Sequence, residues 1–491
     1  MTKTLLVFYL FFIYSLGFSQ SFNLSVSNGH GSGIFSEGDT VYIWSNPEFN
    51  ELVFKEWQGS AVNYMINQNE WLTKIYVPVG SNVGALIADA QFNDLSTIAD
   101  ANIESIILPA LDNGTILMEN EDVYLRVPQN PVGIVFCFHG TGGSGAGFEN
   151  DFEKNSFFKA GANRNYIMVA TNANEKSFGD QNGDDAIRWE INNAYTDEAN
   201  NNIDIKRIKS LRDSLINRFS LSPQFPTFAL GVSNGANFAD LCAAALDFNA
   251  SGHMTGNGHP DIYANRDDAT PVIFVQSEND QHSSANPAIV IANYHALLNR
   301  GISAEFHWHT KTPVYNYRFT RTEDMMIAPS ISESIYQRML NSPGLLNQDY
   351  KLLITNNSEL PTDLFLDLGL NSGSINDCEN QIKIMNADHK FHSHFNNRII
   401  DFFELHNTSS SSFSELNEQG IIFLYPNPTN DRVFLSEKNV IADFKLYTAT
   451  GKLLETFHEQ TYLDLSSYPS GQYFIEIQLG NTIILKNILK N

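Results

Sequence analysis

The sequence predicts an α/β fold in its central part, a parallel sheet with helices on both faces, between a small N-terminal β domain and a C-terminal β-sandwich. Apolar runs alternate with amphipathic helical stretches between residues 119 and 406. Residues 21–90 and 421–491 instead alternate apolar and polar side chains between Gly, Pro and Asn turns. A serine-rich polar segment, residues 407–420, has the composition of a linker between the last two domains.

The size and charge of the chain exclude some classes of function. At 491 residues it is too long for one typical core and suggests about three units. Its 55 acidic and 30 basic residues give a formal net charge of −25, which repels phosphate backbones and anionic lipids. We therefore expect no nucleic-acid partner.

The first twenty residues have the composition of a secretory signal peptide. Lys3 precedes an apolar run from Leu5 to Phe18, and small and polar residues follow. The run is shorter than the ~20 residues of a membrane-spanning helix, so we expect an exported protein without a membrane span. The three cysteines allow at most one disulfide, and the apolar surroundings of Cys137 and Cys242 predict small buried side chains.

Within the central domain, apolar runs predict four buried parallel strands, at residues 133–138, 166–171, 227–230 and 271–276. Apolar residues at helical spacing around Leu211 and Leu241 predict amphipathic helices between them. Residues 91–118 are interpreted as a connector between the N-terminal domain and the first of these strands.

The strongest catalytic motif is Gly231-Val232-Ser233-Asn234-Gly235, which matches G-x-S-x-G. It directly follows a predicted strand and directly precedes a predicted helix, the context in which the motif forms a strained turn that exposes a nucleophilic serine. The same motif also occurs by chance in ordinary glycine-rich turns. Its position favours the catalytic interpretation, with Ser233 as the nucleophile.

Attack by Ser233 on a carbonyl carbon requires backbone N–H groups that face the developing oxyanion. The N–H of Asn234 is one expected donor. The second is expected in the HGTGG loop that begins at His139, from Thr141 or Gly142. This loop also matches the dinucleotide-binding motif G-x-G-x-x-G, but the next strand ends in Asn-Ala-Asn without the acidic residue that binds ribose. We expect no cofactor.

A triad acid and base are expected later in the chain, after the fourth strand and before the last helix. Asp280 is the favoured acid, and Glu278 is the alternative. Three histidines compete for the base: His389, His392 and His394. The base would take the proton of the serine and return it to the leaving group.

The same three histidines have a second interpretation, because clustered imidazoles are the usual ligands of zinc. No acidic or cysteine motif accompanies them. We expect His392 and His394 to lie on solvated surface, and we predict no metal site.

Five segments together resemble a family of α/β-hydrolase esterases that includes polyhydroxybutyrate depolymerases and feruloyl and acetylxylan esterases: FHGTGG, NIDIKRIKSLRDSLINRF, GVSNGAN, QSEND and ADHKFHSHFNNRIIDFF. The resemblance covers residues 132–405. It implies hydrolysis of a carboxylic ester by a triad of Ser233, Asp280 and His389, because His389 and the aromatic residue two positions later match the family's histidine loop. The chain between the acid and the base is longer than in the family, and we expect residues 310–380 to form a cap over the site.

The two ends carry further resemblances. The segments YPNPTNDRVFL, FKLYTATGKLL and YPSGQYFIEI resemble the C-terminal sorting domain of the type IX secretion system, over residues 421–491. This implies export through that machinery, by way of the periplasm, to the medium or the cell surface. The strings LSVSNGHGSGIFSEGDTVYIWS and FKEWQG resemble the internalin-type bacterial repeat, a small β module that serves as a spacer.

These features predict a secreted serine esterase that acts on an external ester. The substrate classes suggested by the resemblance are polymeric: acyl or feruloyl groups on a polysaccharide, or a polyester. A serine peptidase of the same fold and a secreted binding protein without catalysis are the alternatives.

Overall fold

The computed structural model describes residues 20–46, 52–181, 183–191, 201–259, 269–282, 285–321, 327–407, 424–425, 429, 431–435, 442–448, 453–479 and 482–490. The predicted signal peptide and the predicted linker lie, but for one residue each, outside these ranges. The chain divides into two compact units, Met1–Pro47 with Phe54–Asn93, and Glu48–Val53 with Asp94–Asn491.

The N-terminal unit consists of short strands, as its alternating sequence predicts. Its strands are β1 (Ser21–Ser27), β2 (Gly29–His30), β3 (Gly33–Ser36), β4 (Thr40–Ser45), β5 (Leu52–Gln58), β6 (Leu72–Tyr76) and β7 (Ala85–Asp94). They form one sheet of order β3-β1-β7-β5 and another of order β2-β4-β6. Inward-facing residues such as Phe22, Ile43 and Trp57 are fully buried and form one core.

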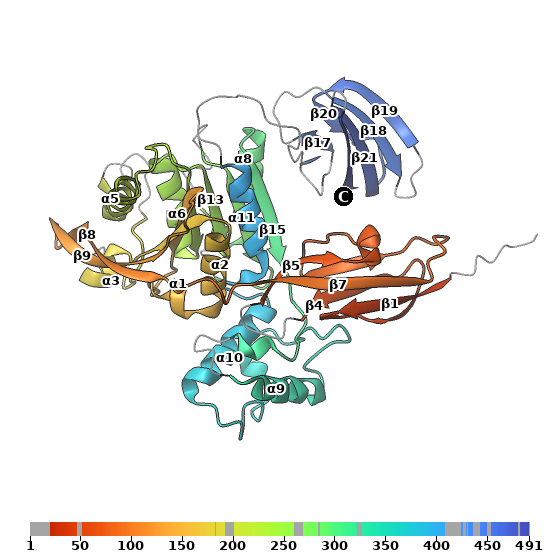
Figure 1. Cartoon of the computed structure of the whole chain (residues 1–491), viewed down its shortest axis with the longest axis horizontal. Helices are drawn as coiled ribbons and strands as arrows, with labels where there is room; N and C mark the ends of the chain where they lie inside the picture. Colours follow the sequence, from red (N-terminus) through yellow and green to blue (C-terminus); the bar gives the residue numbers. More distant parts are fainter. Residues whose placement is uncertain are drawn as a thin grey trace, which may run out of the picture. The chain divides into compact units, whose positions relative to one another are not determined.

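The central domain is built on an eight-stranded, mostly parallel sheet (Figure 1). The strands are β8 (Asn102–Asp112), β9 (Thr115–Arg126), β10 (Gly133–Phe138), β11 (Tyr166–Ala170), β12 (Thr227–Val232), β13 (Ala250–Met254), β14 (Val272–Ser277) and β15 (Ala304–His309). Their order is β15-β14-β13-β12-β10-β11-β9-β8, and all neighbours from β15 to β11 are parallel. The four parallel strands expected from the apolar runs are confirmed.

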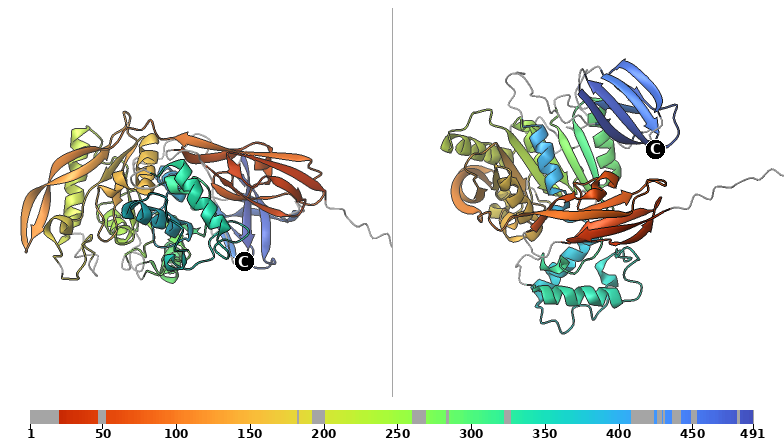
Figure 2. Two further views of the ribbon diagram at one scale, coloured as in Figure 1. Left: turned by 90° about the horizontal axis from the view of Figure 1, so that it is seen from below. Right: turned by 45° about the vertical axis from the view of Figure 1, so that its right-hand side comes forward.

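Helices cover both faces of this sheet, which confirms the predicted α/β class (Figures 1 and 2). They are α1 (Gly147–Asn150), α2 (Phe152–Asn163), α3 (Asn174–Phe178), α5 (Ile203–Arg218), α6 (Asn234–Ala245), α8 (Pro287–Asn299) and α11 (Asn396–Leu405). Side chains of β10 alternate between two cores: Phe136 and Phe138 share one with α5, α6 and α8, whereas Val135 and Cys137 share the other with α2 and α11. Each fully buried side chain of this size stabilises the fold by ~1.5–3 kcal/mol.

The segment at residues 91–118 is not the connector that the sequence suggested. It contains the end of β7, the whole of β8 and the start of β9, and β8 is an edge strand of the central sheet. An Asn113-Gly114 turn with positive φ at both residues joins β8 to β9, the geometry that two-residue hairpins favour. The sequence does not alternate strictly over these two strands, because several apolar side chains also lie on their exposed face.

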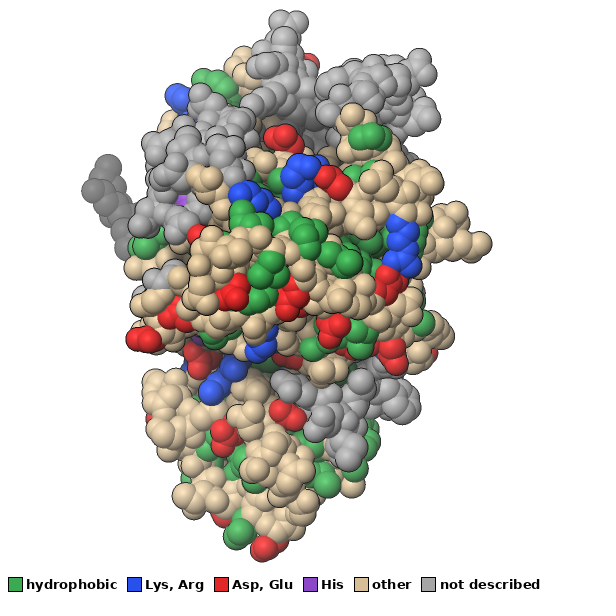
Figure 3. All heavy atoms as spheres, turned by 90° about the vertical axis from the view of Figure 1, so that its left-hand side faces the viewer, with side chains coloured by type: hydrophobic (Ala, Val, Ile, Leu, Met, Phe, Trp, Pro, Cys, Tyr) green, Lys and Arg blue, Asp and Glu red, His purple; other side chains and the backbone are tan. Residues whose placement is uncertain are grey.

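Four large apolar side chains on this hairpin are each 59–60% exposed: Ile103, Ile107, Ile116 and Met118. Figure 3 shows the side of the molecule on which β8 and β9 lie, and apolar side chains gather in the middle of that face. Exposed apolar side chains on an edge hairpin are typical of a contact surface.

The long insertion between β15 and α11 has a small core of its own. It contains η3 (Arg318–Thr320), α9 (Pro329–Asn341), η4 (Asn357–Glu359) and α10 (Ser372–Met385). Its buried cluster includes Phe319, Ile335, Ile382 and Met385, so the insertion continues a few residues beyond the predicted end at residue 380. Cys378 lies in this cluster, and all three cysteines are free and buried, which confirms the prediction for Cys137 and Cys242.

The C-terminal domain is a β-sandwich, as predicted. Its strands are β16 (Leu424–Tyr425), β17 (Arg432–Leu435), β18 (Ala442–Thr448), β19 (Leu453–Gln460), β20 (Tyr462–Asp464), β21 (Gly471–Leu479) and β22 (Thr482–Lys490). Sheets of order β16-β17-β20 and β19-β18-β21-β22 share one apolar core. Among the described residues of the whole chain, no helix is both long and apolar enough to cross a membrane.

Candidate active site

Ser233 lies where strand β12 turns into helix α6, in a strained backbone conformation. Its φ is 56° and its ψ is −120°, a combination that costs a residue with a side chain about 1–3 kcal/mol. A Cβ atom on Gly231 would collide with the carbonyl of Gly235, and one on Gly235 would collide with the carbonyl of His139. The two glycines of the motif are therefore required by close backbone contacts around the serine.

The strand order places this turn at a switch point of the sheet. From β10 the chain passes to β11 on one side, and it then returns to β12 on the other side of β10. The loops after β10 and β12 therefore leave the sheet in different directions, and a crevice opens between them at the carboxyl ends of the strands. Ser233 follows β12, and the HGTGG loop follows β10.

His139 holds the first turn of that loop. Its side chain is buried, Nε2 accepts a hydrogen bond from the N–H of Ala173 at 3.2 Å, and Nδ1 lies 2.8 Å from the carbonyl oxygen of Gly140. Because Nε2 accepts, the proton is on Nδ1, which donates to Gly140. Burial lowers the pKa of His139 to about 4, so the ring is uncharged at neutral pH.

The two residues proposed from sequence as the second oxyanion donor differ in their backbone hydrogen bonds. The N–H of Gly142 donates to the carbonyl oxygen of Ile187 at 2.7 Å, so it is already engaged within the loop. Thr141 lines the pocket beside Ser233. This local contact favours Thr141 over Gly142 as the proposed second donor.

Asn234, the residue after the serine, is fixed by its side chain. Its Oδ1 accepts from the N–H of Trp189 at 2.9 Å, and its Nδ2 donates to the carbonyl oxygen of the same residue at 3.2 Å. The Trp189 indole donates to the carbonyl oxygen of His139 at 3.0 Å and stacks on Phe238. Trp189 thus connects the serine turn with the HGTGG loop, a role that no motif around it indicates.

The structure brings His389 and Asp280 together. Nδ1 of His389 lies 2.7 Å from Oδ2 of Asp280, whose other oxygen accepts from the N–H of His282 at 2.9 Å. Asp280 follows β14 and is only 5% exposed. Glu278 is exposed, faces away and accepts from the N–H of Lys311 at 2.7 Å.

The loop that carries His389 is fixed against the loop that carries Asp280. The N–H of Asn279 donates to the carbonyl oxygen of Ala387 at 3.0 Å, and its Nδ2 donates to that of Asn386 at 2.6 Å. The ring of His282 stacks on that of His389. These contacts explain why two residues far apart in the chain meet with hydrogen-bonding geometry.

Ser233 and His389 line one pocket of about 480 Å³. His139, Thr141 and His282 line it as well, together with side chains from α2. Part of its wall comes from the long insertion, through Arg321, Asp377, Asn380, Gln381 and Ile384. The insertion therefore contributes directly to the pocket that contains the serine.

A buried carboxylate on α2 supports the segment that follows His389. Glu153 is 1% exposed, and its Oε2 accepts from the N–H and the hydroxyl of Ser393 at 2.8 and 2.6 Å. Arg318 and Arg321 lie 3.5 and 3.4 Å from its Oε1. Burial alone would raise the pKa of Glu153, but the two guanidinium groups and the hydrogen bonds from Ser393 hold it at about 2.

The expectation that His392 and His394 are solvated was wrong for His392. His392 is fully buried, and His394 is only partly exposed. Both lie in one group with His309 from the end of β15, and His389 is not part of this group. His392 lies against the ring of His309, and its N–H contacts the sulfur of Met254 at the end of β13. These neighbours are distant in sequence, so the residues around His392 do not reveal its burial.

Solved structures with similar chains include several esterases. A thermophilic esterase from the Planctomycetes species Thermogutta terrifontis is 13% identical, with 43% of this chain and 82% of that chain covered and a TM-score of 0.30. A carboxylesterase from Mesorhizobium loti is 13% identical, with 43% and 90% covered and a TM-score of 0.30. An esterase called PE8 is 18% identical, with 42% and 88% covered and a TM-score of 0.29. At these scores the likeness tells nothing about the activity of this chain.

No curated protein matches the chain. Residues 423–491, in contrast, match the family described as "Secretion system C-terminal sorting domain". This match agrees with the resemblance seen in the sequence and with the observed sandwich. The last domain is a type IX sorting domain, and the protein is therefore secreted or displayed at the cell surface.

Proposed function

We propose that this protein is a secreted serine hydrolase of carboxylic esters, with Ser233 as nucleophile, His389 as general base and Asp280 as the acid of the triad. The observation that supports this most is the 2.7 Å contact between His389 Nδ1 and Asp280 Oδ2, at the edge of the pocket into which the strained Ser233 turn opens. The contact leaves Nε2 of His389 to exchange a proton with the serine hydroxyl.

In the proposed reaction, Ser233 Oγ attacks the ester carbonyl while His389 accepts its proton, and Asp280 stabilises the resulting imidazolium. The N–H groups of Asn234 and Thr141 would donate to the oxyanion of the tetrahedral intermediate. His389 then returns the proton to the leaving alcohol, and an acyl-enzyme on Ser233 remains. Water activated by His389 hydrolyses the acyl-enzyme and restores the free serine.

The proposed substrates are esters outside the cell, such as acyl or feruloyl groups on a polysaccharide, or a polyester. Export as a sorted protein supports an external substrate. The pocket size supports an acyl group of moderate length, because pockets for small ligands begin at about 300 Å³. We propose that the N-terminal β unit acts as a spacer and that the insertion caps the site.

The purified protein should be assayed on p-nitrophenyl esters of increasing chain length, acetylated xylan, methyl ferulate and peptide anilides. We expect ester hydrolysis that Ser233→Ala abolishes, and covalent labelling by a fluorophosphonate at Ser233 alone. Hydrolysis of anilides in preference to esters would instead identify a peptidase. Full ester hydrolysis by Ser233→Ala would refute the proposed nucleophile.

A further inference from the structure

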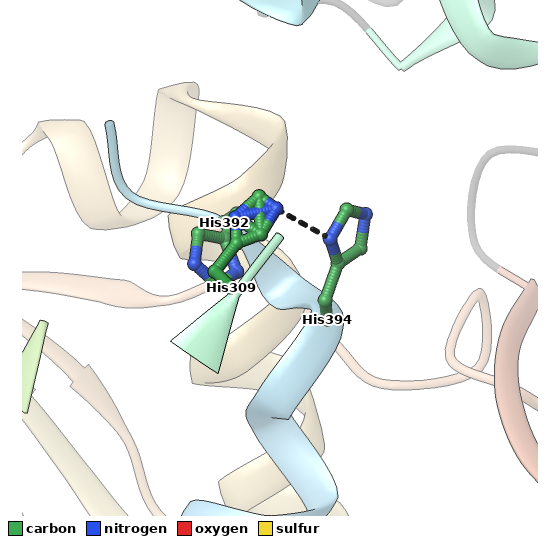
Figure 4. A group of neighbouring side chains, drawn as sticks. All are labelled: His309, His392 and His394. Atoms are coloured by element: carbon green, nitrogen blue, oxygen red, sulfur yellow. Dashed lines mark hydrogen bonds between the residues drawn. The ribbon is translucent and has the colours of Figure 1, made fainter. Parts of the chain in front are cut away.

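Three histidines outside the proposed triad converge beside it. His309 is the last residue of β15, His392 directly precedes η5 (Ser393–Phe395), and His394 lies within η5. One ring nitrogen from each comes within 4.8 Å of the other two. Figure 4 shows the rings of His309 and His392 against each other, with a hydrogen bond between His309 and His394.

Two of these rings are buried with hydrogen-bonding capacity left over. His309 is 2% exposed and His392 is fully buried. Neither ring nitrogen of His392, nor Nδ1 of His309, has a hydrogen-bond partner within the described ranges of the chain. Buried polar atoms without a partner are costly and rare in folded proteins, and each such atom requires a physical explanation.

The spacing of the nitrogens also suits a metal. Nε2 of His309 and Nδ1 of His394 are 3.2 Å apart. Two nitrogens bound to one tetrahedral zinc ion at 2.0–2.1 Å each are separated by about 3.3 Å. A set of imidazoles alone favours zinc and its neighbours in the first transition series over calcium or magnesium, which prefer oxygen ligands.

We propose that His309, His392 and His394 bind one divalent transition-metal ion, with Zn²⁺ as the best fit and water in the fourth position. The site is separate from Ser233 and His389, and it does not depend on the proposed esterase activity. His392 follows His389 by three residues, so the ion would fasten the segment next to the triad base to the end of β15. Its proposed role is to position this segment.

One neighbouring cation must move when the ion binds. Nη1 of Arg318 lies 3.1 Å from Nε2 of His394 and donates to it in the metal-free arrangement. With Nδ1 of His394 on the metal, the proton of this ring moves to Nε2, and Arg318 can no longer donate there. Glu153, whose Oε1 is 3.5 Å from Nη2 of Arg318, is the acceptor toward which the guanidinium would turn. The negative charge of Glu153 would also offset the positive charge of the metal ion.

The experiment uses the protein purified without a polyhistidine tag and stripped with EDTA. After incubation with Zn²⁺ and gel filtration, we expect one zinc per chain by elemental analysis. Titration with Co²⁺ should produce the visible absorption of a tetrahedral cobalt site, saturating at one equivalent. Zinc should raise the melting temperature, because a ligand that binds only the folded state stabilises it.

Matched variants locate the ion. His309→Ala and His394→Ala should each lose the cobalt absorption and the thermal shift, whereas His295→Ala, an exposed histidine on α8, should keep both. Ser233→Ala should bind metal as the unmodified protein does, which separates this site from the proposed activity.

If a histidine variant does not fold, the cobalt titration of the unmodified protein decides whether the chain binds one metal ion. Less than a tenth of an equivalent of zinc after incubation, with no cobalt absorption and no thermal shift, would overturn the proposal and leave a buried histidine cluster without a metal. Equal metal content in His394→Ala and the unmodified protein would overturn it as well.

Discussion

The imidazole of His282 stacks on that of His389, with ring centroids 4.5 Å apart and ring planes inclined by 22°. Both rings line the pocket that contains Ser233, and the backbone N–H of His282 donates to Asp280. A flat ring against the proposed base restricts the directions in which that base can rotate. His282 is therefore placed to keep His389 in line with its two proposed partners, Asp280 and Ser233.

We expect His282→Ala to lower kcat about 10-fold for a p-nitrophenyl ester with little change in KM, because misorientation of a catalytic group affects the transition state more than binding. His282→Phe, which preserves a flat ring and the backbone hydrogen bond, should retain most of the activity. Steady-state kinetics of both variants provide the test. Equal losses in the two variants would show that stacking is not the cause.

The choice between two acidic residues can be tested directly. Asp280→Asn should lower kcat by roughly 10⁴-fold, as the loss of a triad acid does when the geometry is retained. Glu278→Gln should change it less than about twofold, because Glu278 is exposed and contacts Lys311. Circular dichroism spectra should show both variants folded. A large loss in Glu278→Gln with an active Asp280→Asn would reverse the assignment.

The buried carboxylate of Glu153 should matter for stability. In Glu153→Gln, Arg318 and Arg321 lose their buried counter-charge, and we expect the free energy of unfolding to fall by about 3–5 kcal/mol. Glu404→Gln removes a partly exposed partner of Arg164 and should cost less than about 1 kcal/mol. Urea unfolding at pH 7 measures both. A loss in Glu153→Gln no larger than in Glu404→Gln would contradict this prediction.

One buried and one half-buried histidine should make the protein sensitive to mild acid. Burial lowers the pKa of His253 to about 3 and that of His406 to about 4, against 6.5 in an unfolded chain. As the pH falls, the unfolded state binds these protons before the folded state does. The two neutral histidines therefore contribute fully to the free energy of unfolding above about pH 6.5, and this contribution is lost as the pH falls toward their folded pKa values. Between pH 6 and 4 each such histidine should lower the free energy of unfolding by up to about 1.4 kcal/mol per pH unit.

The slope of the free energy of unfolding against pH reports how many protons are taken up on unfolding. In His253→Phe this slope should correspond to about one proton fewer than in the unmodified protein. His295→Gln, which changes an exposed histidine on α8, should leave the slope unchanged. The same slope in His253→Phe as in the unmodified protein would show that His253 is already protonated in the folded state.

The insertion should influence which esters enter the pocket. Asn380 on α10 lines the pocket, and Asn376 on the same helix is exposed and does not. We expect Asn380→Phe to lower kcat/KM for a long-chain p-nitrophenyl ester about 10-fold relative to the acetyl ester, and Asn376→Phe to leave this ratio unchanged. An unchanged ratio in Asn380→Phe would mean that acyl groups do not reach this wall.

The sequence by itself determined the features that depend on neighbouring residues. The run of apolar residues in β10 and the glycines around Ser233 are local, because side-chain periodicity and turn sterics act over only a few positions. The sorting domain was recognisable for the same reason, since its turn residues recur at short intervals. The two buried cysteines on a strand and a helix also followed from their local surroundings.

Only the tertiary structure decided the features that depend on contacts across the chain. Asp280 and Glu278 are two residues apart, yet only Asp280 turns toward His389, because the loop after β14 is held against a loop more than a hundred residues later. The N–H of Gly142 donates to Ile187, a residue that its own motif does not point to, and His392 has His309 as a buried neighbour. Such pairings are set by strand order and loop packing, and residue spacing along the chain does not encode them.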